Sequence, residues 1–354
     1  MAGDTRGELW RWQHSRAEAP PVELEPAEFR AISGWTADDH CAAFDCYLRS
    51  AGLTGQLIPD ADGAQALLRD RQKARAFFEE NFAPFRVLAG PGLLTSYFEP
   101  VLKGARARSA AYTVPVYRRP DDLSPLPQGH RLTGQGLTAA RATAGGFVPY
   151  ATRGEIEAGA LAGRGLEILY LADPVEAFVM HVQGSGRVEL EDGTAVRLTF
   201  DGKNGHPYSS ISKLLVERGH LAREDAHLEG MIAWLRAQPE LQSYLNENKS
   251  YIFFKELEHS AAAPKGSSGA ELRAGRSLAA DPLYHAPGTP IWVEAPELMF
   301  EGGPFRRLLI AQDTGSAITG PQRGDVFAGM GEEAGRVAGR IRHACEFMIL
   351  QPKR

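Results

Sequence analysis

Short apolar runs, each broken by glycine, proline or a tight turn, are the feature of this sequence that most limits its fold. Many of them recur at intervals of about 8–12 residues, a spacing typical of all-β domains. The Asp192-Gly193 dipeptide between two runs is typical of a tight hairpin. Such runs predict an antiparallel barrel and not a parallel βαβ sheet. We expect strands at 86–89, 112–117, 167–170, 177–182, 187–190 and 195–200.

Helical periodicity is confined to a few segments that would flank the strands. We expect one helix from Asp38 to Gly52 and another from Ala64 to Ala83, with apolar residues at three- and four-residue steps. The remaining expected helices are 209–218, 223–246 with a break at Pro239, and 332–343; the remaining expected strands are 251–254, 291–294, 307–311 and 346–350. Residues 259–268 are small and polar and are expected to form an exposed loop. The predicted fold class is mainly β with flanking helices.

Length and charge exclude several classes of protein. The 354 residues correspond to about two domains. The 39 basic and 44 acidic residues give a net charge of −5, which argues against a dedicated nucleic-acid binder. The sequence contains no apolar run long enough for a transmembrane helix, and its first residues show no secretory pattern. The three cysteines form no C-x-x-C pair, which argues against a zinc site and a disulfide framework.

Polar residues gather in four segments where packing alone would not require them: 92–100, 181–186, 280–290 and 311–327. The last segment holds Asp313 and Asp325, twelve residues apart and each close to a glycine. A single aspartate beside glycine is most often a turn former. Two of them, together with Asp281, indicate a candidate site, although spacing alone does not establish one.

Other kinds of active site fit the sequence poorly. Asp313-Thr314-Gly315 matches the Asp-Thr-Gly of pepsin-type proteases, but that chemistry needs a second such motif or a dimer, and a monomeric protease of this length should carry both copies, whereas no second one is present. The glycines beside Ser185 are adjacent to it, whereas a Gly-x-Ser-x-Gly elbow has them two residues away. The ten histidines form no His-x-x-x-His pair, so no metal site is predicted.

Taken together and in this order, the segments resemble the membrane-bound lytic transglycosylase A family of peptidoglycan-cleaving enzymes. The matching blocks are 95–100, 115–120, 182–186 and 248–254, and the C-terminal part is similar to a module whose three aspartates correspond to Asp281, Asp313 and Asp325. The sequence departs from the family pattern at Ser96, Phe98 and Thr319, the last standing where lysine is frequent. It also departs at His285-Ala286-Pro287-Gly288.

The resemblance implies a two-barrel fold. Residues 1–100 and 249–354 would form a double-psi β-barrel with the N-terminal helices, and this domain would carry the three aspartates. Residues 101–248 would form an inserted second β-barrel that binds substrate. A groove between the two domains would hold the glycan strand.

The reaction implied by the resemblance is cleavage of the β-1,4 bond between N-acetylmuramic acid and N-acetylglucosamine without water. The muramyl C6 hydroxyl attacks within the same molecule, so its effective concentration is high and one enzymic carboxyl can suffice where a glycosidase needs two. The family pattern assigns that acid and base to Asp325. We expect Asp313 to orient or tune Asp325 and Asp281 to shape the site, with no cofactor and no metal. The loss of lysine at Thr319 removes a cation expected near Asp325.

The resemblance also implies substrate contacts and partners. Tyrosine rings and short polar side chains are suited to binding sugars, and the expected contacts are Thr95, Tyr97, Glu99, Tyr117, Gln183, Gly184, Ser185, Gly186 and Gly315. The expected partner is a peptidoglycan glycan strand, with other cell-wall enzymes as further partners and no nucleic acid. We expect a monomer in the periplasm or at the outer membrane, with any membrane attachment not encoded in this sequence.

Two alternatives remain open from the sequence. One is a non-catalytic, expansin-like glycan-binding module on the same kind of barrel. The other is a hydrolase of β-1,4-glycans.

Overall fold

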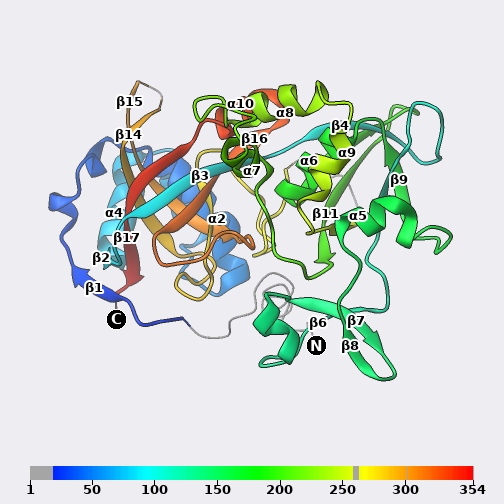
Figure 1. Cartoon of the computed structure of the whole chain (residues 1–354). Coiled ribbons are helices and arrows are strands. Elements are labelled where there is room, and N and C mark those ends of the chain that lie inside the picture. The colour runs from blue at the N-terminus through cyan, green and yellow to red at the C-terminus, as the bar shows by residue number, and fades with distance from the viewer. Residues whose placement is uncertain (1–18, 258–262, 301, 354) are drawn as a thin grey trace. The chain divides into compact units, whose positions relative to one another are not determined.

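The computed structural model describes residues 19–257, 263–300 and 302–353, which belong to two compact units (Figure 1). The aspartate unit comprises the described parts of Glu18–Tyr97, Ala263–Gly329 and Ile341–Arg354. The insert unit comprises the described parts of Phe98–Ala262 and Met330–Arg340. The domain boundaries predicted after residues 100 and 248 stay a prediction.

A closed mixed barrel forms the centre of the aspartate unit. Its strands follow one another in the order β17-β14-β15-β13-β16-β3, and β3 pairs again with β17. Their bounds are β3 Gly92–Glu99, β13 Ser277–Ala280, β14 Pro290–Phe300, β15 Gly303–Asp313, β16 Arg323–Met330 and β17 Arg342–Pro352. On the edge of β17 opposite β14, β3 pairs with residues 342–345, and the sheet continues from residues 348–352 through β2 (Phe82–Leu88) and β1 (Glu23–Pro26). The closure leaves the six barrel strands without a free edge.

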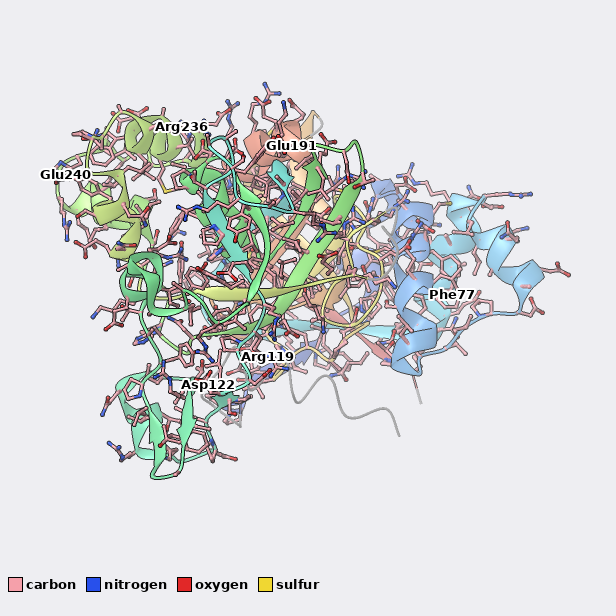
Figure 2. All side chains as sticks on the ribbon, turned by 90° about the vertical axis from the view of Figure 1, so that its right-hand side faces the viewer. Phe77, Arg119, Asp122, Glu191, Arg236 and Glu240 are labelled. Atoms are coloured by element: carbon pink, nitrogen blue, oxygen red, sulfur yellow. The ribbon has the colours of Figure 1, made fainter. Side chains whose placement is uncertain are left out.

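Helices α2 (His40–Thr54), α3 (Ala61–Leu67) and α4 (Arg71–Asn81) lie beside this barrel (Figure 1). Phe77 of α4, labelled in Figure 2, packs edge-on against Phe44 of α2 with ring centroids 5.1 Å apart. These rings share one apolar core with Trp292 of β14. Two short 3₁₀ helices, η1 (Phe29–Ala31) and η2 (Trp35–Ala37), precede α2.

Two predicted helix boundaries in this unit are wrong. The first helix continues past Gly52 and is capped at Gly55, which has a φ of 70°. The predicted helix 64–83 is two helices, because the Asp70 side chain accepts hydrogen bonds from the backbone N–H groups of Gln72 and Lys73 and so begins α4. Asparagine, serine and aspartate are favoured at the N-cap, so Asp70 was the sequence signal that the predicted helix 64–83 is divided.

A second closed barrel lies in the insert unit. The strand order is β12-β11-β10-β4-β9-β5, and a bridge between Arg118 and Phe254 joins the two ends. The bounds are β4 Val101–Ala105, β5 Val114–Tyr117, β9 Glu167–Leu171, β10 Ser185–Leu190, β11 Ala195–Lys203 and β12 Ile252–Glu256. The predicted hairpin is confirmed, with Gly193 at a φ of 81° between β10 and β11. A separate small sheet contains β6 (Leu123–Pro125), β7 (Ala139–Thr143) and β8 (Gly146–Val148) (Figure 1).

The helical elements of the insert unit are η3 Arg131–Gln135, α5 Arg153–Glu155, η4 Ile156–Ala160, α6 Pro174–Gln183, α7 Ile211–Glu217, α8 Leu228–Arg236, α9 Leu241–Asn246 and α10 Gly331–Ala338. The predicted strand 177–182 is wrong, since these residues belong to α6. The Asp173 side chain caps the helix start, Pro174 occupies its first turn, and Gly184 ends it at a φ of 77°. Arg236 of α8, labelled in Figure 2, pairs with both Asp173 and Glu176.

The structure confirms the predicted fold class, mainly β with flanking helices and a barrel in each unit. Within the residues that it describes, no helix combines the length and apolar character needed to span a membrane.

A buried ion pair connects the start of the N-terminal helices to the aspartate-unit barrel. Arg276 donates two hydrogen bonds of 2.8 Å to the two carboxylate oxygens of Asp38, and Leu308 N–H donates a third of 2.9 Å. Only 6% of the Arg276 side chain and 4% of the Asp38 side chain are exposed. A charge in such a place is costly once its partner is removed.

We therefore expect Asp38→Ala to lower the free energy of unfolding by about 3–5 kcal/mol, because Arg276 would remain buried without its counter-charge. Urea unfolding followed by tryptophan fluorescence measures the change. Glu28→Ala is the matched control, since its partner Arg30 is 86% exposed, and we expect a loss below about 1 kcal/mol. A loss of that small size for Asp38→Ala would contradict the assignment.

Candidate active site

Strand register in the aspartate-unit barrel brings Asp313 and Asp325 to either side of one residue. Ala279 of β13 is opposite Asp313 of the parallel strand β15 and opposite Asp325 of the antiparallel strand β16. Residues paired in this way direct their side chains to the same face of a sheet. The two aspartates are therefore two strand spacings apart, about 10 Å between backbones, on one face.

Asp325 carries a carboxyl whose surroundings favour the protonated form. Removal from water raises the pKa of Asp325 to about 6, against the opposing effects of the Arg323 cation and the hydrogen bond from Thr95. The negative charge of Asp313 raises the pKa further. A carboxyl with this pKa keeps its proton at pH values at which an ordinary aspartate has lost it, as a general acid requires.

Gly324 allows β16 to lie close to the barrel core just before Asp325. A Cβ at this position would lie 2.7 Å from the Phe347 ring and 2.9 Å from a methyl carbon of Leu278. Both distances are shorter than real Cβ contacts. The absence of a side chain here therefore allows the strand to approach the core in the position from which Asp325 projects.

Asp313 is surrounded by hydrogen-bond donors. Its Oδ2 accepts from the Tyr97 hydroxyl at 2.9 Å, and its Oδ1 accepts from the N–H groups of Ser267 and Thr314, each at 2.9 Å. Burial raises the pKa of Asp313, and these three donors partly offset that rise. The donors favour a carboxylate of fixed orientation close to Asp325.

Asp281 lies beyond the end of β13 and is fully buried. Its Oδ2 accepts from Gly320 N–H at 2.7 Å and its Oδ1 from Leu283 N–H at 3.1 Å. The His285 ring nitrogen Nε2 contacts the Pro321 carbonyl at 2.8 Å. Both side chains thus support the loop that leads into β16, and this geometry favours a shaping role for Asp281 rather than direct chemistry.

Thr95 and Tyr97 are two residues apart on β3, so both side chains lie on one face of the strand. Thr95 donates to Asp325 Oδ1 and Tyr97 donates to Asp313 Oδ2. The structure therefore brings together four predicted site residues. Gly315 lies in the loop between β15 and β16, where its carbonyl accepts from Ile318 N–H.

The predicted contacts at 183–186 belong to the insert unit. Gln183 ends α6 and accepts a 3.0 Å hydrogen bond from Phe98 N–H, and Gly184 caps the helix. Ser185 and Gly186 begin β10. A Cβ on Gly186 would lie 2.8 Å from the Met180 sulfur, so close packing of β10 on α6 accounts for this glycine.

Glu99 and Tyr117 lie in the interior of the insert unit. The Glu99 carboxylate is fully buried and accepts hydrogen bonds of 3.0 and 3.1 Å from Arg197 Nε. Tyr117 is 5% exposed within an apolar cluster, 6.4 Å from the Tyr251 ring. Burial raises the pKa of Tyr117 to about 12. Both positions favour structural roles, and their substrate contacts stay predictions.

Sequence reasoning missed two residues of the site. Arg323 lies two residues before Asp325 and donates a 2.8 Å hydrogen bond to Thr95, and alternation along β16 was the available signal. Ser267 donates to Asp313 from the segment expected to be an exposed loop. Residues 259–262 of that segment lie outside the described residues, but its later part bonds to β15, where Ser268 N–H donates to the Gln312 carbonyl, and Pro264 is buried.

Known protein families match both units. Residues 93–255 match the MltA specific insert domain, and residues 276–351 match the 3D domain. The membrane-bound lytic murein transglycosylase A of Vibrio cholerae is 37% identical over 262 residues, which cover 72% of this chain and 64% of the relative. The same enzyme of Escherichia coli K12 is 33% identical over 73% of this chain and 65% of the relative. The matched region thus spans just under two thirds of these curated relatives.

Solved structures cover almost the whole chain. A membrane-bound lytic murein transglycosylase from Agrobacterium tumefaciens is 35% identical with a TM-score of 0.81, covering 93% of this chain and 98% of that one. E. coli MltA with bound chitohexaose is 27% identical with a TM-score of 0.67, covering 97% of this chain and 96% of that one. With the two family matches and the site geometry, these similarities show that the chain belongs to the membrane-bound lytic murein transglycosylase A family.

Proposed function

We propose that this protein cleaves the β-1,4 bond between N-acetylmuramic acid and N-acetylglucosamine in peptidoglycan and forms a 1,6-anhydro ring. The observation that carries the proposal is the carboxyl of Asp325, whose pKa is raised to about 6 by burial and by Asp313, although Arg323 and Thr95 favour its charged form. Lytic murein transglycosylases are its relatives, and one of them binds chitohexaose. A glycan substrate is consistent with both observations.

In the first step, protonated Asp325 gives its proton to the glycosidic oxygen. The bond from this oxygen to the muramyl C1 breaks, and N-acetylglucosamine leaves with a free hydroxyl group. Positive charge then develops at C1, as in glycoside cleavage in general. Asp313, held by three donors, adds negative charge on the same face of the sheet.

In the second step, the Asp325 carboxylate accepts the proton of the muramyl C6 hydroxyl. The C6 oxygen forms a bond to C1 and closes the anhydro ring, and Asp325 regains its proton. Water is not consumed. One carboxyl performs both transfers because the nucleophile is already tethered to the reacting carbon.

The two units would divide the work. We assign the chemistry to the predicted domain 1–100 and 249–354 and glycan binding to the predicted insert 101–248. The match of residues 93–255 to an insert domain supports this division. Because the named relatives are membrane-bound, we propose that the protein acts in the periplasm or at the outer membrane.

Asp325→Asn tests the proposed acid. The amide preserves the side-chain shape but holds no transferable proton, so we expect release of 1,6-anhydromuropeptides from purified murein sacculi to fall by about 10²–10⁴-fold. Mass spectrometry of the soluble products measures the loss. Asp62→Asn, at an exposed position of α3, is the control and should retain wild-type release.

Two other outcomes would replace the proposal. Products with reducing ends would identify a hydrolase. Wall loosening by both wild type and Asp325→Asn without soluble fragments would identify a non-catalytic glycan-binding module.

The pH dependence follows from the same carboxyl. The first step needs protonated Asp325, so kcat/KM should fall as the pH rises through about 6, by roughly tenfold for each further pH unit. Initial rates of anhydromuropeptide release at constant ionic strength measure this limb. A rate that stays level from pH 5 to 8 would rule out Asp325 as the group that must be protonated.

A further inference from the structure

Arg323 is the charged residue of this site that the proposed reaction leaves without a role. It lies on the same face of β16 as Asp325, two residues away. Its Nη2 donates to Thr95 Oγ1 at 2.8 Å, and its Nη1 contacts the carbonyls of Leu93, at 3.3 Å, and Gly324. These contacts from β3 and from its own strand hold the guanidinium in one orientation.

Hydrogen-bond chemistry fixes the direction of the contact between Thr95 and Asp325. A guanidinium has only donors, so Thr95 Oγ1 must act as the acceptor toward Arg323. The single hydroxyl hydrogen of Thr95 is then available for Asp325 Oδ1. Oδ1 is occupied as an acceptor, which leaves Oδ2 as the oxygen that carries the proton of the neutral carboxyl.

We propose that Arg323 is a positioning residue that acts through Thr95 to place the transferable proton of Asp325 on Oδ2. The role in turnover rests on the proposed function, whereas the coupling of Arg323, Thr95 and Asp325 does not. Without the guanidinium, the Thr95 hydroxyl is free to rotate and to accept from Asp325, so the proton would be distributed over both oxygens.

The charged and titratable groups around Asp325 allow this effect to be isolated. Tyr97 faces the site from β3 and Asp313 faces it from β15. Two residues of β17, Arg342 and Cys345, act on Arg323. Arg323 is the group of opposite charge that acts on Asp325, and it opposes the rise in pKa caused by burial. Removal of its charge should therefore raise the pKa of Asp325 further.

The direct test is an NMR titration of the Asp325 carboxyl carbon in the full chain, with the resonance identified by its loss in Asp325→Asn. We expect Arg323→Met to move the titration upward by about one pH unit or more. Thr95→Val should also move it upward, and Thr95→Ser, which keeps the hydroxyl, should restore the wild-type value. Arg30→Met, at a site 86% exposed, is the control and should leave the titration unchanged.

Coupling is tested with the double variant Arg323→Met/Thr95→Val. If Arg323 acts through Thr95, the two pKa shifts are not additive. The shift of the Asp325 titration in the double variant is then smaller than the sum of the shifts in the two single variants. The alkaline limb of anhydromuropeptide release should move upward with the NMR titration in Arg323→Met, while kcat falls and KM is unchanged. Arg323→Lys keeps the charge but not the fork of donors, so it should keep the titration near wild type and still lower kcat.

Additive shifts, or an unchanged titration in Arg323→Met, would overturn the proposal. If Arg323→Met does not fold, the titration of Thr95→Val against Thr95→Ser and the kcat of Arg323→Lys decide the matter. Because the titration needs no substrate, failure of the proposed function is seen separately. In that case the wild type would release no anhydromuropeptides although the coupled shifts are present.

Discussion

The return of β3 to both β16 and β17 is the contact on which the rest of the aspartate unit depends. It closes the barrel and joins segments that are more than two hundred residues apart in the chain. Thr95 reaches Asp325 and Tyr97 reaches Asp313 only because β3 occupies this place. The buried pair of Asp38 and Arg276 attaches the N-terminal helices to the same barrel. The site is therefore a product of long-range pairing and not of any local segment.

Much of the fold could be predicted because its signals are local. Short apolar runs with turn residues between them predicted most strands, and Asp192-Gly193 predicted its hairpin. Residues 177–182 show where this reasoning is insufficient, since a short apolar run fits a buried helix as well as a strand. The cap residues around α6, Asp173 and Gly184, held the information that decides between the two.

The site was predictable in residue type and only partly in role. Resemblance to a family indicated Asp281, Asp313 and Asp325, but chain spacing could not reveal that Ala279 lies between two of them. Chain spacing also could not reveal that Glu99, expected to contact substrate, has its carboxylate buried against Arg197. Partners such as Ser267 and Arg323 come from register and loop packing, which a single sequence does not encode in any short pattern.

Gly324 has a consequence for how this enzyme family can vary. The Phe347 ring and a Leu278 methyl group lie so close to this glycine that the space beside it holds a hydrogen atom but not a methyl group. A side chain there would have to displace the Phe347 ring, the Leu278 methyl or the strand that carries the neighbouring acid, without touching any reacting atom. Divergence at this position would have to be accompanied by smaller neighbours at 278 and 347. These three positions are thus expected to change together among homologues, because joint changes would preserve the orientation of the Asp325 carboxyl.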